Sequence, residues 1–448
     1  MSKTIAEIQA QFASGATTSQ AETEVALGAI DATDGEGARA FTRVYHDRAR
    51  ATARASDDTR ALGIAGGPLS GVTISIKDLF DVAGEVTLAG SRVRDRSAPA
   101  TEDAPIVARL RAAGAVIVGR TNMTEFAFSG LGINPHYDTP RNPWDRAAGR
   151  IPGGSSSGAA VSVADGMAAA AIGTDTGGSV RIPSALCGLT GFKPTARVVP
   201  TAGAFPLSTT LDSIGPLANS VACCALIHQV MSGAPVRPLV ARPVAGMTLG
   251  VPQTIFQDDM DDHVAAAFGA ALSRLSAAGA RLVDIPFDVT EDIVAANATG
   301  GFASPEAFAT LRDLLASDEV RFDPRVSVRV KRGGAMSAAD YITLLEDRAV
   351  ICAKADAASR DYDALLLPTT PIVAPPIAEL SASDDAYHAA NMLMLRNSSF
   401  GNFLDRCATS LPVHRAGEAP VGLMVMGETL GDQKALEVAA GIEAALSA

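Results

Sequence analysis

Two glycine- and serine-rich segments bracket one helix-plus-strand unit in the first half of this 448-residue chain. The first is Gly153-Gly-Ser-Ser-Ser-Gly158 and the second is Gly173-Thr-Asp-Thr-Gly-Gly-Ser179. Glycine at this density is unfavourable inside helices and strands, so both segments are predicted to be loops. Between them, residues 158–165 are predicted to form a helix and residues 168–173 a buried strand. Only one helix and one strand therefore separate the two serine-bearing loops along the chain.

Helices alternate with short apolar strands along much of the chain. Residues 1 to about 60 are predicted to be helical, with Thr4 and Thr18 as N-caps. Further helices are predicted at 103–113, at 262–278 and from 431, and further strands at 115–118, 281–285, 363–367 and 421–426. This alternation predicts an α/β fold with a mixed sheet covered by helices on both faces.

A lone lysine, Lys77, ends an apolar run in which Val72, Ile74 and Ile76 alternate as in a strand. Lysine can act as a base only where burial lowers its pKa, and this run supplies apolar surroundings. Asp78 would oppose that effect at close range, but strand alternation points it to the other face. Two serines and a lysine can supply a nucleophile, a proton relay and a base without histidine or metal. The combination points to hydrolysis of an amide.

Composition narrows the class of protein. The chain carries 37 Lys and Arg against 49 Asp and Glu, and it has no dense basic run, which argues against direct nucleic-acid binding. Five cysteines without a Cys-x-x-Cys pair argue against a disulfide scaffold or zinc site and favour a reducing compartment. The N-terminus lacks an apolar signal core, and no segment is apolar enough to span a bilayer. We therefore expect a cytoplasmic protein that is not bound to a membrane.

The two loops belong to a longer series of motifs. The others are Ile76-Lys77-Asp78, Cys187-Gly-Leu-Thr-Gly-Phe-Lys-Pro194 and Leu211-Asp-Ser-Ile-Gly-Pro216. In this order and spacing they resemble the amidase signature family, closely over residues 65–220 and diffusely elsewhere.

The resemblance implies a catalytic triad of Ser179, Ser155 and Lys77, with a cis peptide bond before Ser155. Ser179 would attack the carbonyl carbon, and Ser155 would pass the proton to Lys77 and return it to the leaving ammonia or amine. Water would then hydrolyse the acyl-enzyme. No metal or organic cofactor is implied, and the expected partner is a small-molecule amide.

The second loop would have a different role. The resemblance implies that backbone N–H groups of Thr176, Gly177 and Gly178, together with that of Ser179, form the oxyanion hole. Glycines at two of these positions permit the unusual dihedral angles that let successive N–H groups converge.

Five residues are candidates for substrate binding or its immediate surroundings. In the family, the segment over residues 121–129 lines the acyl pocket, so Met123, Phe126 and also Phe128 are pocket candidates, with ordinary core packing as the other interpretation. Ser156 is expected to hydrogen-bond within the triad, and Arg181 to support the loop or meet a polar end of the substrate. The C-terminal segment 397–412 is expected to complete the pocket.

The family resemblance also suggests how the chain is organised. We expect a single domain over residues 1–448, with a helical arm (1–60), a signature region (65–220) and a C-terminal lobe (248–448). The Pro- and Ala-rich segment 232–247 is the predicted boundary between lobes. The sequence is compatible with a homodimer and does not determine the oligomeric state.

Other interpretations remain at this point. The segment Gly154-Ser-Ser-Ser-Gly158 matches the Gly-x-Ser-x-Gly nucleophile elbow of α/β-hydrolases, which requires a preceding strand and an essential histidine. The same segment read alone is a flexible connector. The chain also resembles the glutaminase component of glutamyl-tRNA amidotransferase, which acts in a complex and passes on the ammonia from glutamine. A non-catalytic scaffold is the last alternative, although the intact serines and lysine speak against it.

Overall fold

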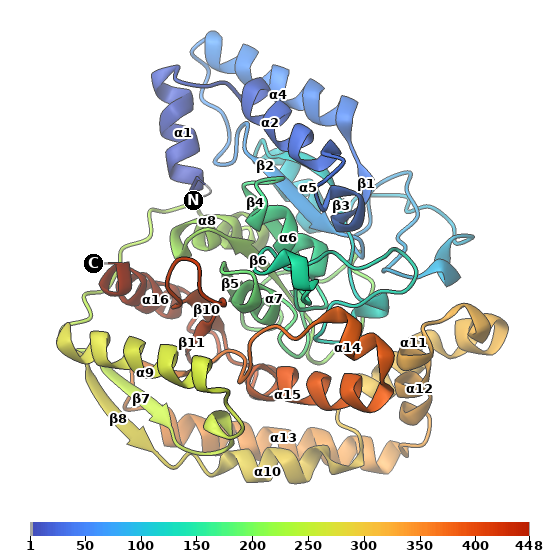
Figure 1. The fold of residues 1–448 in the computed structure, drawn as a ribbon, viewed down its shortest axis with the longest axis vertical. Helices are drawn as coiled ribbons and strands as arrows, with labels where there is room; N and C mark the ends of the chain where they lie inside the picture. The colour runs from blue at the N-terminus through green and yellow to red at the C-terminus, as the bar shows by residue number, and fades with distance from the viewer. Residues whose placement is uncertain (1–2, 448) are drawn as a thin grey trace.

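The computed structural model describes residues 3–447, which form an 11-stranded sheet (Figure 1). The strand order is β1-β3-β2-β4-β6-β5-β10-β11-β9-β7-β8. The strands are β1 Phe41–Val44, β2 Thr73–Lys77, β3 Val116–Thr121, β4 Ala170–Asp175, β5 Thr190–Lys193, β6 Ser213–Ala218, β7 Thr248–Pro252, β8 Arg281–Ile285, β9 Ala364–Pro368, β10 Ala408–Pro412 and β11 Gly422–Met426.

Strand pairing makes the sheet mixed, as predicted. β2 runs parallel to β3 and β4, and β7 runs parallel to β8 and β9. The other pairs, which include all those in the middle of the sheet, are antiparallel. The ends of β2 and β4 therefore emerge side by side at the same edge, where Lys77 and Asp175 end their strands.

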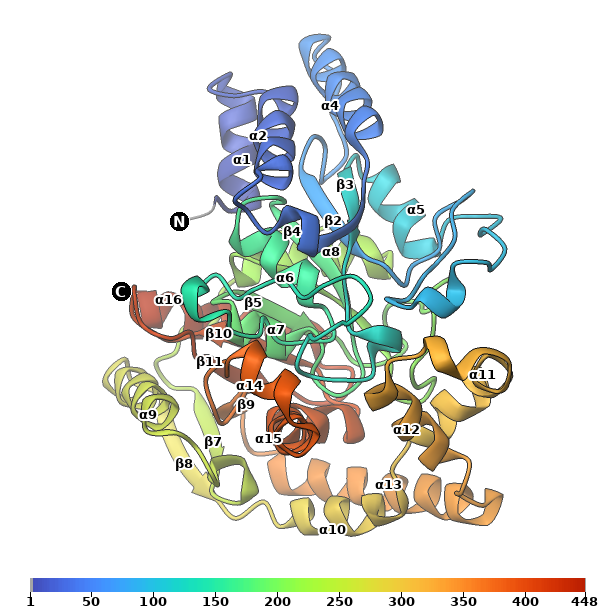
Figure 2. The same ribbon diagram turned by 45° about the vertical axis from the view of Figure 1, so that its right-hand side comes forward.

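Helices cover both faces of the sheet, as predicted. They are α1 Ile5–Ser14, α2 Ser19–Asp31, α3 Gly37–Ala40, α4 His46–Ala61, α5 Pro105–Ala112, α6 Ser157–Ala164, α7 Arg181–Leu186, α8 Val221–Ser232, α9 Asp262–Ala277, α10 Val289–Ala296, α11 Ala303–Asp318, α12 Pro324–Gly333, α13 Ala338–Ser359, α14 Ile377–Ala382, α15 Asp384–Phe403 and α16 Asp432–Ser447. Side chains of α5, α8, α9 and α16 form one core with one face of the sheet. On the opposite face, α2, α4 and α6 cover one half of the sheet, and α10, α13 and α15 cover the other. α11 and α12 pack against each other above one end of α13 (Figure 2).

The N-terminal helices begin where the sequence predicts. The Thr4 side chain accepts from Glu7 N in a capping box, and the Thr18 side chain accepts from Ala21 N. α2 and α4 then pack beside β3, at the upper end of the sheet in Figure 1. The helical arm expected over residues 1–60 also contains the short strand β1, and residues 1 and 2 lie outside the described residues.

Several elements differ from the sequence expectation. The strand expected at 168–173 spans Ala170–Asp175, because pairing with β6 continues through the start of the second glycine loop. The face of β2 that carries Ser75 and Lys77 is buried like the other, because α6 covers it. Residues 232–247 have no strand and only the end of α8, and they connect α8 to β7. No helix within residues 3–447 is long and apolar enough to cross a membrane.

Candidate active site

Lys77 lies at the centre of a buried polar cluster at the ends of β2 and β4. Its Nζ donates to Ser155 Oγ at 2.7 Å and to Thr174 Oγ1 at 2.8 Å. Lys77 and Ser155 are both 0% exposed. The structure thus brings the predicted base into direct contact with the predicted relay. Thr174, the second partner of Lys77, is a residue that the sequence interpretation missed, although it stands inside the Gly173–Ser179 motif.

Burial lowers the pKa of Lys77 from 10.5 to about 7. The carboxylates of Asp212 and Asp175 work in the opposite direction, because they favour the charged ammonium. Asp78 does not pair with Lys77: it accepts from Arg120 Nε at 2.5 Å and from Thr42 Oγ1 at 2.8 Å. Lys77 is therefore a lysine whose neutral form is available near neutral pH.

The loop that carries Ser155 is held by backbone contacts on both sides. The Gly154–Ser155 peptide bond is cis, as the family resemblance implies. Gly154 N donates to Gly130 O at 2.8 Å, and Thr124 N donates to Ser155 O at 3.1 Å. A Cβ at position 154 would lie 2.4 Å from Gly132 N, so this close approach of two backbone segments requires glycine. The segment 124–132 and the Ser155 loop thus form one packed unit.

The loop that carries Ser179 is organised by Asp175, the last residue of β4. Its carboxylate accepts from Gly178 N at 2.9 Å and Val180 N at 3.1 Å. It also accepts from Arg181 Nε at 3.0 Å and Arg181 Nη2 at 2.9 Å. Arg181 and Asp175 are both 0% exposed, and the guanidinium holds the pKa of the Asp175 carboxyl well below its usual range. Arg181 therefore has the supporting role, because its guanidinium is bound to Asp175.

We expect Asp175→Asn to lower the free energy of unfolding by about 3–5 kcal/mol, because it leaves the Arg181 guanidinium buried without its anion. Urea denaturation measures the change. Asp165→Asn is the matched control, because Asp165 pairs with the partly exposed Arg146 at 2.9 Å and its loss should cost about 1 kcal/mol or less. Equal losses in the two variants would contradict the supporting role of Asp175.

Three of the four backbone N–H groups assigned to the oxyanion hole have no acceptor among the described residues. Within residues 3–447, no hydrogen bond from the N–H of Thr176, Gly177 or Ser179 is present, whereas the N–H of Gly178 is used by Asp175. Gly178 is thus removed as a donor. The loop requires glycine at this position for its backbone conformation. The φ of Gly178 is 126°, and a Cβ there would lie 2.0 Å from Ser398 Oγ of α15.

Asp212 is a second residue that the sequence interpretation missed. Its Oδ1 accepts from Thr176 Oγ1 at 2.5 Å, and its Oδ2 accepts from Leu207 N at 3.0 Å and Ser208 N at 3.2 Å. Burial raises the pKa of Asp212 to about 6. The motif Leu211–Pro216 contained this residue, but nothing in the sequence pointed it toward Thr176. Asp212 therefore contacts the predicted oxyanion-hole loop at Thr176, and its charge also acts on Lys77.

The other candidate substrate residues pack in the core. Met123 and Phe126 are 0% and 1% exposed, and the Phe126 ring lies 5.4 Å from the rings of Phe205 and Phe322. Ser156 is also 0% exposed, and its Oγ donates to Thr174 O at 3.4 Å rather than to a triad side chain. The packing of Met123 and Phe126 corresponds to the core interpretation given above.

The nucleophile-elbow interpretation is wrong. It needs a strand directly before Gly154. In the described chain β3 ends at Thr121, and the residues between β3 and α6 contain no further strand. The flexible-connector interpretation also fails, because residues 151–163 are all buried.

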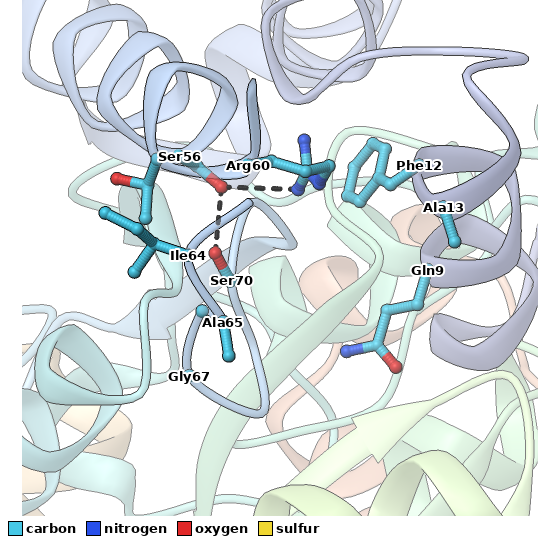
Figure 3. Close-up of a pocket in the computed structure, with 11 residues that line it drawn as sticks. Gln9, Phe12, Ala13, Ser56, Arg60, Ile64, Ala65, Gly67 and Ser70 are labelled. Atoms are coloured by element: carbon cyan, nitrogen blue, oxygen red, sulfur yellow. Dashed lines mark hydrogen bonds between the residues drawn. The ribbon is translucent and has the colours of Figure 1, made fainter. Parts of the chain in front are cut away.

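A separate pocket of about 280 Å³ lies between α1, α4 and the turn at residues 64–70 (Figure 3). Ser56 Oγ and Ser70 Oγ are hydrogen-bonded there at 2.9 Å, and Arg60 lies over the Phe12 ring. Its lining includes none of the candidate catalytic residues.

Comparisons with known proteins agree on one family. The Amidase family model matches residues 23–436. A 2-amino-5-chloromuconic acid deaminase from Comamonas testosteroni is 39% identical over 89% of this chain and 86% of its own length. A component of glutamyl-tRNA(Gln) amidotransferase from Streptomyces avermitilis is 34% identical over 99% of this chain and 95% of its own. A crystal structure of an amidase, 32% identical, superposes with a TM-score of 0.88 and covers 99% of both chains.

Proposed function

This chain belongs to the amidase signature family, and we propose that it hydrolyses a carboxylic amide through an ester formed on Ser179. As a member of the family it is an amidohydrolase that acts on carbon–nitrogen bonds of small molecules. The observation that carries the proposed mechanism is the 2.7 Å contact between Lys77 Nζ and Ser155 Oγ in a site without solvent exposure.

Ser179 is suited to be the nucleophile. Its side chain is 3% exposed and makes no hydrogen bond to another group within residues 3–447, in contrast to Ser155, which is bound to Lys77. As the Ser179 hydroxyl attacks the carbonyl carbon, its proton passes to Ser155 Oγ and the Ser155 proton passes to Lys77. The C–N bond breaks when Lys77 returns a proton, through Ser155, to the departing nitrogen. Water then cleaves the ester by the same relay.

The negative charge on the carbonyl oxygen needs donors that are already in place. The N–H groups of Thr176, Gly177 and Ser179 are free to serve, and Gly177 is the one partly exposed residue of residues 173–181. Asp175 and Asp212 hold this loop through Gly178 and Thr176. Donors in fixed positions need no reorganisation during reaction, and each is typically worth about 3–4 kcal/mol.

A second candidate is the ammonia-supplying component of an amidotransferase. The relative from glutamyl-tRNA(Gln) amidotransferase favours it, since it matches over nearly the full length of both chains. The two functions use the same chemistry at Ser179 and differ in where the ammonia goes. Our proposal is the simpler one, in which the chain acts in the cytoplasm without nucleic acid or membrane as a partner. It is compatible with a homodimer.

Ammonia release from a panel of primary amides, glutamine included, tests the proposal. We expect the purified chain alone to release ammonia from at least one non-glutamine amide. Release from glutamine only, and only after addition of a partner protein, would support the amidotransferase candidate instead. No release from any amide under either condition would contradict both.

A further inference from the structure

One carboxylate of α11 accepts hydrogen bonds from four donors in other parts of the fold. Glu306 accepts from Thr210 N at 3.1 Å and from the hydroxyl groups of Ser208, Thr210 and Tyr341. It forms no salt bridge within residues 3–447. Its place in the first turn of α11 puts the negative charge at the positive end of the helix dipole. Because hydrogen bonds to a charged acceptor are roughly twice as strong as neutral ones, this carboxylate holds its partners firmly.

Three of these four donors belong to a turn that ends at Asp212. Ser208 O accepts from Leu211 N at 3.2 Å and from Asp212 N at 2.8 Å, which closes the turn over residues 208–212. Ser208 also joins the two carboxylates, since its Oγ donates to Glu306 and its N donates to Asp212 Oδ2 at 3.2 Å. Glu306 therefore fixes the turn from one side, and the turn fixes the Asp212 carboxylate on the other.

Asp212 extends this contact into the candidate active site. Its Oδ1 accepts from Thr176 Oγ1 at 2.5 Å, and Thr176 provides one of the backbone N–H groups assigned to the oxyanion hole. The other side of that loop is held by Asp175, which accepts from Gly178 N. The Thr176 side therefore depends on the Asp212 contact, and Asp212 depends on the turn that Glu306 binds.

The two carboxylates also affect each other through their charges. Burial is the main cause that raises the pKa of Asp212 to about 6, and the nearby charge of Glu306 adds to it. Like charges repel, so donors that bind both groups are needed to keep them close together. Ser208 supplies one donor to each. Removal of Glu306 therefore frees the turn and also changes the charge that acts on Asp212.

We propose that Glu306 is a positioning residue, which holds the oxyanion-hole loop in its reactive geometry through the turn at residues 208–212. The inference rests on the proposed function and adds to it a residue of the C-terminal lobe. Glu306 does not touch the reacting atoms. It acts on kcat because donors to the carbonyl oxygen work in the transition state, where their placement matters most. The other interpretation is that Glu306 only anchors α11 to the rest of the fold.

The kinetics of Glu306 variants test this role. In Glu306→Ala, kcat should fall by about 100-fold while KM changes less than about threefold, since a displaced catalytic group can cost this much. Glu306→Gln keeps one acceptor oxygen and should recover part of the loss.

Tyr341→Phe is the matched control. It removes a donor to the same carboxylate but leaves the turn bound to Glu306, so it should keep most of its kcat. Equal losses of kcat in Glu306→Ala and Tyr341→Phe, or a loss that appears in KM alone, would contradict the positioning role and leave Glu306 as an anchor of α11.

A double-mutant cycle tests the route by which Glu306 acts. Thr176→Val removes the hydroxyl group that binds Asp212. Glu306→Ala should then cost much less kcat in the Thr176→Val background than in the wild type, whereas independent effects would multiply. Fully multiplied losses, or a Thr176→Val variant with wild-type kcat, would overturn the route. Glu306→Gln takes the place of the alanine variant in the cycle if the latter does not fold.

Amide hydrogen exchange decides the inference without turnover. Exchange followed by mass spectrometry should be faster in residues 205–214 and also in residues 174–181 of Glu306→Ala than in the wild type, whereas Tyr341→Phe should match the wild type. Faster exchange confined to residues 205–214 would mean that Glu306 holds only its own turn, and would overturn the inference. Since exchange does not depend on Ser179 as the nucleophile, a failure of the proposed function is distinguishable from a failure of this inference.

Discussion

Ser179→Ala should lower kcat for ammonia release from any amide substrate by at least about 10⁴-fold, because it removes the atom that accepts the acyl group. The fold should be unchanged, since the Ser179 side chain makes no hydrogen bond within residues 3–447 and the loop is held by Asp175 and Arg181. Ammonia assays on wild type and variant, with urea denaturation of both, measure the two effects. KM should change little if Ser179 contributes to the chemical step rather than to binding.

Ser155→Ala is the informative comparison. It removes the proton relay but keeps the nucleophile, so a serine-directed sulfonyl fluoride should still label Ser179, more slowly than in the wild type. Ser179→Ala should not be labelled. Labelling that follows Ser155 instead would exchange the two roles, and residual turnover above about 1% of wild type in Ser179→Ala would contradict covalent catalysis by this residue.

The parts of the structure that local sequence signals determine were predictable. Thr4 and Thr18 cap their helices through their own side chains, so the cap depends on residues within three positions. Strand β8 spans Arg281–Ile285 as expected, because an apolar run follows a helix of clear periodicity. The contact between Lys77 and Ser155 was predictable for another reason, which is that the motifs around both residues resemble those of one family.

The roles that depend on distant segments were not predictable in the same way. The family resemblance implies an oxyanion-hole role for Gly178, but its backbone, with a φ of 126°, directs its N–H to Asp175. Asp212 meets Thr176 only because β6 pairs with β4, a register that no local pattern reveals.

Activity on a substrate without ionisable groups should rise with pH through about 7, because Lys77 accepts a proton only in its neutral form. Its pKa is lowered to about 7 by burial, so the base is protonated and inactive at pH 5 and free at pH 9. Well below pH 7, kcat/KM should increase about tenfold per pH unit and then level off. Lys77→Ala should lose the rise and about 10²–10⁴-fold in kcat. A wild-type profile that is flat from pH 5 to 9 would contradict Lys77 as the base.

Asp212 provides the test of which group titrates. Its own pKa is raised to about 6, so an inflection near neutrality could belong to either residue. The Asp212 carboxylate favours the ammonium form of Lys77, and Asp212→Asn removes that charge. The pKa of Lys77 should then fall, and the inflection should move to lower pH with its slope unchanged. If Asp212 were the titrating group, the same substitution would abolish the inflection instead of shifting it. A shift toward acid in Asp212→Asn, together with a flat profile in Lys77→Ala, assigns the base to Lys77.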